Sequence, residues 1–303
     1  MNVFVTGATG FIGKAVVREL ITAGHSVTGL ARSDSSVGTL AKMGAKAHRG
    51  DLGDTVSLVA GARAADGVIH LAFNHDFENT PRDVASETDR QVVEAMTGAM
   101  EGTNKPFVLT SGTAILAFSL PPGNVGTEND APATGVSRGA SEEAVLVAAK
   151  RGVRTSLIRL SPTVHGAGDV GFIPALIDIA RRTGVAAYVG DGANRWPAVH
   201  RFDAARLFRL ALEKAGPGTR LHGVAEEGIP MRSIAETIGA GLGVPVKSLT
   251  DDEAKIHFGW IAGFVGVDNP TASSVTRAAL GWEPREVGLL EDMRESGYFT
   301  QST

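Results

Sequence analysis

The segment from Thr6 to Gly13 reads TGATGFIG and decides the fold of the first half of this chain. It follows the apolar run Asn2 to Thr6, which has the pattern of a strand, and it opens an amphipathic stretch with the pattern of a helix. Gly7 permits the sharp turn from strand to helix, Gly10 lets backbone approach a phosphate, and Gly13 lets the helix pack closely on the sheet. Because the free N–H groups at such a helix start bind phosphates, the segment predicts a dinucleotide site. The loop residues expected to contact the dinucleotide are Gly7, Thr9, Gly10, Phe11, Ile12 and Gly13.

Short apolar runs alternate with amphipathic stretches outward from this loop, a pattern typical of β-α-β units that build a parallel sheet. The expected strands are Asn2 to Thr6, Ser26 to Leu30, Ala45 to His48, Gly67 to Ala72, Phe107 to Thr110 and Thr155 to Leu160. From about residue 161 the elements become shorter and richer in Pro, Trp and Phe. We therefore predict an α/β chain with a Rossmann-type, doubly wound parallel sheet. Residues 1–160 form the dinucleotide-binding domain and residues 161–303 a small C-terminal substrate-binding cap, of which about 199–225 return to the sheet.

The composition excludes several classes of function. The 303 residues include 29 basic and 33 acidic side chains, a net charge of −4, and no Cys. Disulfides, thiolate nucleophiles and Cys-bound metals are therefore absent, and no His or carboxylate spacing predicts a metal site. No basic arm indicates nucleic acid, and no apolar run indicates a membrane span or a targeting segment. We expect a cytoplasmic protein that binds small molecules.

The end of the second expected strand predicts which dinucleotide binds. Arg32 and Ser33 stand where an NAD site usually places Asp or Glu to bind the adenosine ribose. Because the guanidinium of an arginine binds a 2′-phosphate, Arg32 and Ser33 favour NADP(H) over NAD(H). The alternative is that Arg32 is solvated and Asp34 binds the ribose.

Further landmarks follow in order along the chain: Gly50-Asp51-Leu52, Val68-Ile69-His70-Leu71-Ala72, Val108-Leu109-Thr110-Ser111 and Trp196-Pro197-Ala198-Val199-His200. With TGATGFIG, they resemble the extended short-chain dehydrogenase/reductases, the NAD-dependent epimerase/dehydratase group. The resemblance implies that Asp51 and Leu52 border the adenine and that Leu71 and Ala72 line the ribose-phosphate stretch. It also implies that Ser111 lies beside the nicotinamide and that the segment from Pro162 through Val164 to His165 lies along the nicotinamide face.

The chain departs from that family at its usual proton donor, the Tyr of a Tyr-x-x-x-Lys motif. Its two tyrosines, Tyr188 and Tyr298, are followed four residues later by Gly and Ser, so the motif is missing. The register from Ser111 places Thr134 at the Tyr position and Arg138 at the Lys position. Arg138 can bind ribose hydroxyls and supply positive charge, but neither it nor Thr134 releases a proton readily near neutral pH.

Three routes remain for a reductase. In the first route another side chain donates the proton. His165 is the first candidate, because the resemblance implies that it lies beside the nicotinamide and because the ordinary pKa of a histidine is close to neutral pH. His200 is the second candidate, although a structural role is favoured for it. Alternatively, Ser111 or Thr113 orients a water. In the third route the substrate is an iminium ion, which already carries its proton.

The expected cap carries aromatic residues rather than clustered cations. Ile256, Trp260 and Phe264 are spaced i, i+4, i+8, and Trp196 stands near the start of the cap; Trp196 and Trp260 are the expected substrate contacts, with Thr113. Arg195 and Arg201 could bind an anion, but they form no cluster, and we expect both to be solvated.

We therefore expect an NADP(H)-dependent oxidoreductase that acts on a small, largely apolar C=O or C=N compound. The alternatives are a non-catalytic NADP(H) sensor and a nucleotide-sugar epimerase or dehydratase. The helices expected at Asp83 to Glu101 and Ser137 to Lys150 resemble those through which relatives dimerise, so a homodimer is expected.

Overall fold

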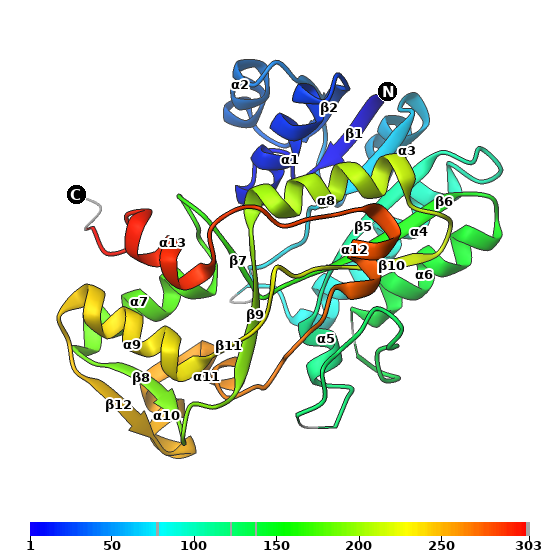
Figure 1. Ribbon diagram of the computed structural model, residues 1–303. Helices are drawn as coiled ribbons and strands as arrows, with labels where there is room; N and C mark the ends of the chain where they lie inside the picture. Colours follow the sequence, from blue (N-terminus) through cyan, green and yellow to red (C-terminus); the bar gives the residue numbers. More distant parts are fainter. Residues whose placement is uncertain (77–78, 122, 137, 301–303) are drawn as a thin grey trace.

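A seven-stranded sheet forms the centre of the computed structural model, which describes residues 1–76, 79–121, 123–136 and 138–300 (Figure 1). Every pairing in it is parallel, in the order β10-β6-β5-β4-β1-β2-β3. The strands are β1 (Asn2–Thr6), β2 (Ser26–Ala31), β3 (Lys46–Arg49), β4 (Gly67–His70), β5 (Pro106–Gly112), β6 (Arg154–Leu160) and β10 (Thr219–Gly223). The chain order reverses between β1 and β4, and sheets of this kind bind ligands at the carboxyl ends of the strands beside such a reversal. The predicted Rossmann-type doubly wound sheet is confirmed.

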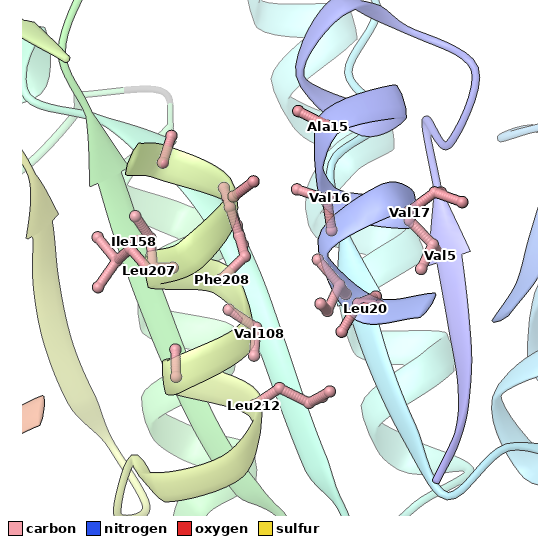
Figure 2. Packing of buried hydrophobic residues seen from close by; sticks show 14 of the residues in the cluster. Val5, Ala15, Val16, Val17, Leu20, Val108, Ile158, Leu207, Phe208 and Leu212 are labelled. Carbon is pink, nitrogen blue, oxygen red and sulfur yellow. The ribbon is translucent and has the colours of Figure 1, made fainter. Parts of the chain in front are cut away.

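Helices cover both faces of the sheet. One face carries α1 (Phe11–Thr22), α2 (Asp34–Lys42) and α8 (Arg201–Lys214), and the other carries α3 (Thr55–Ala64), α4 (Arg82–Gly98) and α6 (Gly139–Lys150). Figure 2 shows the first of these cores, where Val16 and Leu20 of α1 and Phe208 of α8 lie with side chains of the strands. Each such side chain contributes roughly 1.5–3 kcal/mol on burial. The two cores hold the carboxyl edge of the sheet rigidly in place.

A second, smaller lobe has its own core. Its strands are β7 (Thr163–His165), β8 (Ala186–Val189), β9 (Arg195–His200), β11 (Glu226–Pro230) and β12 (Val246–Leu249). They form a three-stranded sheet, β11-β9-β7, and a two-stranded sheet, β12-β8. Its helices are α7 (Phe172–Thr183), α9 (Met231–Leu242), α10 (Asp251–Phe258), the 3-10 turn η1 (Gly259–Ile261), α11 (Ala262–Val265) and α13 (Leu289–Glu295). Two short helices, α5 (Ala114–Ala117) and α12 (Ser274–Leu280), complete the described elements. No described helix could cross a membrane, since none is both long and apolar enough.

The end of β4 differs from the sequence prediction. The strand was expected to continue to Ala72 but ends at His70, because the next two residues leave the ladder and bind Thr6. Leu71 N donates to the Thr6 carbonyl at 3.3 Å, and Ala72 N donates to Thr6 Oγ1 at 3.2 Å. These two bonds hold the segment after β4 against the start of the glycine loop.

Candidate functional site

The glycine loop between β1 and α1 is closed by backbone contacts. Gly7 has a φ of +67°, and a Cβ there would lie 2.8 Å from Ala72 N, so this position requires glycine. Gly10 N donates to the Gly7 carbonyl at 3.0 Å. A Cβ on Gly13 would lie 2.0 Å from that same carbonyl oxygen. Gly13 therefore lets the first turn of α1 lie against the backbone that directly follows β1, in keeping with the close helix–sheet packing expected of it.

The start of α1 is suited to a phosphate. Gly10 is the N-cap residue, and no side chain caps the helix. The first N–H groups of α1, at Phe11 and Ile12, thus have no side-chain acceptor of their own, and Thr9 precedes them in the loop. Free N–H groups and the positive end of the helix dipole attract an anion. The loop therefore fits the pyrophosphate of a dinucleotide.

The residues expected at the adenosine end lie at the carboxyl edge beside β2 and β3. Arg32 and Ser33 are exposed, and Ser33 Oγ accepts a hydrogen bond from Ser36 N at 3.2 Å, which caps α2. Asp34, the alternative ribose ligand, forms an ion pair with Arg49. The alternative ribose ligand is thus paired with an arginine, and both side chains of the pair are exposed.

Four further residues expected to border the cofactor follow two strands at the same edge. Asp51 and Leu52 come after β3, and Leu71 and Ala72 come after β4. Asp51 is exposed, and its Oδ1 accepts a hydrogen bond from Gly53 N at 2.7 Å, while the other three are partly or largely covered. The topology therefore brings these residues to the edge where the glycine loop also lies.

Three buried donors near the end of β5 have no partner within the described part of the chain. They are Thr110 Oγ1, Ser111 Oγ and Arg138 Nε. The Arg138 guanidinium lies 3.9 Å above the ring of Phe73, and its Nη2 donates to the Thr110 carbonyl at 2.9 Å. Buried polar atoms almost always find partners, so the donors at this edge are available to acceptors of a bound ligand or water.

A chain of buried hydrogen bonds connects Arg138 to the strand that precedes the glycine loop. Thr6 Oγ1 is 2.7 Å from His70 Nδ1, and His70 Nε2 is 3.2 Å from Asp89 Oδ1. Since Ala72 N already donates to Thr6 Oγ1, the network is satisfied when the Thr6 hydroxyl donates to Nδ1 and Nε2–H donates to Asp89. Ser141 Oγ donates to Asp89 Oδ2 at 2.6 Å.

The Asp89 carboxylate is the counter-charge of Arg138, at 4.0 Å from its Nη2. Burial alone would raise the pKa of Asp89, but the hydrogen bond from His70 and the charge of Arg138 hold that pKa below its ordinary value. The sequence prediction missed Asp89 and His70. An acid on the buried stripe of an amphipathic helix, among Ala85, Val92 and Met96, was the signal that could have found the first of them.

Thr134 does not stand in the position that the motif register predicts. Helix α6 begins at Gly139 with Arg138 as its N-cap residue, and Gly135 has a φ of +90°. Thr134 therefore lies outside the helix, is exposed, and shares no helix face with Arg138. A spacing of four residues brings side chains together only within a helix, so the prediction for Thr134 is corrected.

His165 is enclosed between β7 and α13. It is 1% exposed, and its Nδ1 lies 2.9 Å from Asp292 Oδ2. Its ring packs edge-on against His200, whose Nδ1 accepts from Phe202 N and so caps α8, the structural role favoured for it. A ring buried and paired in this way holds α13 in place and has no open path to a substrate. Of its neighbours in the expected nicotinamide segment, Val164 belongs to the main core and Pro162 is partly exposed.

His75 is a titratable side chain near Arg138 that the sequence prediction missed. It is exposed, and its ring centroid is 5.0 Å from that of Phe73, the ring on which Arg138 stacks. Partial burial and the charge of Arg138 lower the pKa of His75 below its ordinary value. The sequence gives little sign of it, because only the folded loop after β4 brings it to this edge.

Two of the three expected substrate residues are structural. Thr113 is buried, and its hydroxyl accepts a hydrogen bond from Asn269 Nδ2 at 2.9 Å. Trp196 is 2% exposed, and its Nε1 donates to the Val267 carbonyl at 3.2 Å. Both side chains join segments of the protein to each other, which corrects their assignment as substrate contacts.

An aromatic cluster connects the two lobes near this edge. Phe172 of α7 is its centre, with ring centroids 5.5 Å from Trp196, 6.3 Å from Trp260 and 5.5 Å from Phe264. Phe118, which follows α5 on the sheet side, lies 6.3 Å from Phe264. Trp260 remains 64% exposed, so the cluster presents aromatic surface that a ligand can cover.

The expected stripe of Ile256, Trp260 and Phe264 is wrong. Gly259, with a φ of +56°, ends α10 and separates it from α11, so the three positions do not follow one helix. Ile256 consequently points into solvent and is 88% exposed. Among the residues that the structure describes, no group of three His, Cys, Asp or Glu could hold a metal ion.

Comparisons with known proteins agree with this geometry. The model of the NAD dependent epimerase/dehydratase family matches residues 3–222. An uncharacterized protein of Schizosaccharomyces pombe is 47% identical over 300 residues, which cover 99% of this chain and 100% of that protein. A 2-alkyl-3-oxoalkanoate reductase of Stenotrophomonas maltophilia is 28% identical over 261 residues, 81% of this chain and 77% of the relative. The structure of the UDP-glucose 4-epimerase of Thermus thermophilus in complex with NAD superposes with a TM-score of 0.77 at 20% identity and covers 100% of both chains.

Proposed function

Because the chain belongs to the NAD dependent epimerase/dehydratase family, we propose that it is an NADP(H)-dependent oxidoreductase that reduces a small, largely apolar C=O or C=N substrate. One observation carries the proposal: Ser111 Oγ and Arg138 Nε are buried without partners, among the residues that the structure describes, at the sheet edge that also holds the glycine loop. The aromatic cluster around Phe172 supports an apolar substrate, because its rings lie where the two lobes meet near this edge and offer aromatic surface to a ligand.

From these donors we propose roles for the residues at the nicotinamide end. A reduced nicotinamide supplies a hydride when it is bound. Arg138, held by Asp89 and the Thr110 carbonyl, would donate hydrogen bonds to the ribose hydroxyls. The Ser111 hydroxyl would donate to the reacting oxygen of a carbonyl substrate, or accept from the N–H of an iminium substrate, and so orient it.

We propose His75 in place of His165 as the source of the proton for a carbonyl substrate. His165 is enclosed, whereas His75 is exposed beside the ring on which Arg138 stacks. Because the pKa of His75 is lowered, its imidazolium form is populated only on the acid side of its ordinary pKa. Ketone reduction should therefore slow as pH rises through a pKa below about 6.5.

The matched test replaces each histidine in turn. In His75→Gln the pH dependence should disappear and the rate should fall to the high-pH value, whereas His165→Gln should lower stability and leave the shape of the profile unchanged. A cyclic imine, already protonated, should show no loss in His75→Gln. An unchanged ketone profile in His75→Gln would refute the role of His75.

The preference for NADP(H) is part of the proposal and rests on Arg32. The Asp34 carboxylate is paired with Arg49, which leaves Arg32 and Ser33 at the start of α2 to bind a 2′-phosphate. We expect NADPH to bind about tenfold or more tightly than NADH, the effect of roughly 1.4 kcal/mol. Arg32→Ala should remove this preference while NADH binding stays within about twofold. Unchanged selectivity in Arg32→Ala would exclude Arg32 as the determinant.

The substrate class is tested with panels of ketones, aldehydes and cyclic imines and NADPH. Several relatives named as reductases, including vestitone reductase of Medicago sativa at 25% identity, make ketones the first panel to try. Ser111→Ala should lower kcat about tenfold or more and change KM for NADPH little, because its hydroxyl is proposed to act on the reacting atom. Robust turnover in Ser111→Ala would exclude that role.

Two rival functions have separable outcomes. A non-catalytic sensor would bind NADPH without oxidising it in the presence of any panel member, and would capture a partner only when NADPH is bound. An epimerase or dehydratase would be stabilised by nucleotide diphosphosugars in a thermal-shift screen. The aromatic cluster that includes Phe118, Phe172 and Trp260 favours the reductase, since sugar nucleotides call for cationic and polar contacts.

We also propose that the protein is a homodimer formed through α4 and α6. These two helices lie side by side on one face of the sheet (Figure 1). They resemble the helices through which relatives dimerise. Sedimentation velocity at micromolar concentration should give the mass of two chains, and a monomer at these concentrations would exclude the dimer.

A further inference from the structure

Arg201 lies between two aromatic rings at the start of α8. Its guanidinium carbon is 5.1 Å from the centre of the Phe11 ring and 4.8 Å from that of the Phe202 ring. The sequence predicts a solvated Arg201, and this position corrects that prediction. Since Phe11 is the first residue of α1, Arg201 brings a positive charge to the helix start proposed to bind the pyrophosphate.

The positive charge of Arg201 has no carboxylate partner in the described part of the chain, and its buried Nε has no hydrogen-bond partner there. Asp203, the acid in the first turn of α8, is engaged elsewhere: it binds Arg206 and accepts from the backbone N of Arg285 at 2.8 Å. Arg195, also expected to be solvated, instead binds Asp268 at 2.8 Å. Arg201 thus differs from this arginine in lacking a counter-ion among the described residues.

The electrostatics around Arg201 call for an anion. Helices α1 and α8 pack against each other on one face of the sheet, and Arg201 contacts the first residue of α1 while being itself the first residue of α8. The start of each helix carries a partial positive charge, which repels a cation and attracts an anion. A guanidinium held at two helix starts is therefore stabilised when a phosphate binds there.

The neighbouring Gly166 shows that Arg201 lies on the side of the glycine loop that faces the expected nicotinamide segment. A Cβ on Gly166 would be 3.2 Å from Arg201 Cγ and Cδ and 2.9 Å from His200 Nε2, so the glycine leaves the space that the arginine stem occupies. Gly166 directly follows β7, the strand at the expected nicotinamide segment. Arg32 lies after β2, on the other side of β1 from β4.

We propose that Arg201 binds the nicotinamide-side phosphate of the dinucleotide, held in place by Phe11 and Phe202. This inference rests on the proposed cofactor site and assigns a further residue to it. The two rings and the Gly166 backbone pre-order the guanidinium, so little side-chain freedom is lost when the phosphate binds.

The test compares two ligands and two variants by titration calorimetry. ADP-ribose contains both phosphates, and AMP contains only the adenosine-side phosphate. Arg201→Met keeps the apolar stem and removes the charge; Arg18→Met, on the exposed side of α1, makes the same change in net charge as a control. We expect Arg201→Met to weaken ADP-ribose about 10- to 100-fold, the range for a lost hydrogen bond to a charged group, and to leave AMP within about twofold.

Arg201→Lys, which restores the charge without the planar fork, should recover part of the ADP-ribose affinity, and thermal unfolding of each variant verifies that it is folded. Equal binding of ADP-ribose by Arg201→Met and Arg18→Met would overturn the inference about Arg201 alone. An equal loss for AMP and ADP-ribose would also overturn it, because Arg201 would then support only the loop. Failure of the unchanged protein to bind ADP-ribose would overturn the proposed cofactor site as well.

Discussion

Replacing Gly13 by Ala should show whether the backbone contact of the glycine loop outweighs the usual gain in helix stability from removing a glycine. A Cβ at position 13 would stand 2.0 Å from the Gly7 carbonyl oxygen, so this backbone contact must open by more than 1 Å to reach the usual separation of about 3.3 Å. No side-chain rotation relieves a clash between a Cβ and a backbone oxygen. Overpacking of this kind costs about 1–3 kcal/mol, against a gain of about 0.5–1 kcal/mol from replacing a helical glycine.

Gly38 provides the matched control. It lies inside α2, and a Cβ there would meet no atom within 4 Å. Gly38→Ala should therefore raise the free energy of unfolding by about 0.5–1 kcal/mol and leave NADPH affinity unchanged. Gly13→Ala should lower it by about 1–2 kcal/mol and weaken NADPH about tenfold or more, because the opened loop no longer presents its N–H groups to the phosphates.

Urea unfolding and titration calorimetry measure the two effects separately. Both variants add the same atoms to a helix, so the expected result is a change in the free energy of unfolding of opposite sign in the two variants. If Gly13→Ala and Gly38→Ala gave the same free energy of unfolding and the same NADPH affinity, the closure of the loop at Gly7 and Gly13 would not be what shapes the site.

Two further predictions concern buried carboxylates. Asp89→Asn keeps the hydrogen bond from His70 at its amide oxygen, and its NH2 group can donate to Ser141 Oγ in place of the bond that Asp89 accepts. It removes the charge 4.0 Å from Arg138, an interaction of about 1 kcal/mol in water and about 4 kcal/mol near a protein surface. Because Arg138 is 26% exposed and Asp89 only 3% exposed, the interaction lies between these two figures, and KM for NADPH should rise about tenfold or more. Ser141→Ala should raise KM less, and equal effects of the two variants in steady-state kinetics would contradict this role of Asp89. Burial raises the pKa of Asp169 to about 6. A raised acid pKa favours the protonated folded form, so this carboxyl destabilises the fold increasingly as pH rises from its unfolded pKa near 4 through about 6. Asp169→Asn should thus raise the free energy of unfolding by about 1–2 kcal/mol at pH 8 and by almost nothing at pH 4, and a pH-independent effect in urea titrations would disprove the assignment.

The sequence by itself determined the sheet and the phosphate loop. These follow from local rules: a strand that is buried on both faces needs a continuous apolar run, and a turn with a φ of +67° at Gly7 needs glycine. The same local reasoning placed Arg32 and Ser33 at the end of β2, because strand and turn residues are consecutive in the chain. Arg138 also reached the expected edge, although the motif spacing that pointed to it fails at Thr134.

Only the tertiary structure decided which side chains meet. Asp89 lies in α4 and Arg138 is the N-cap residue of α6, and the pairing of His165 with Asp292 joins residues 127 positions apart, so no spacing rule predicts either contact. Arg201 and Phe11 come together because α8 packs beside α1 after the chain has passed through the first part of the smaller lobe. The sequence shows which side chains are charged, but the packing of the elements determines which counter-ion each of them meets. Among the described residues of this site, Asp89 lies beside a cation, whereas Arg201 has no carboxylate partner.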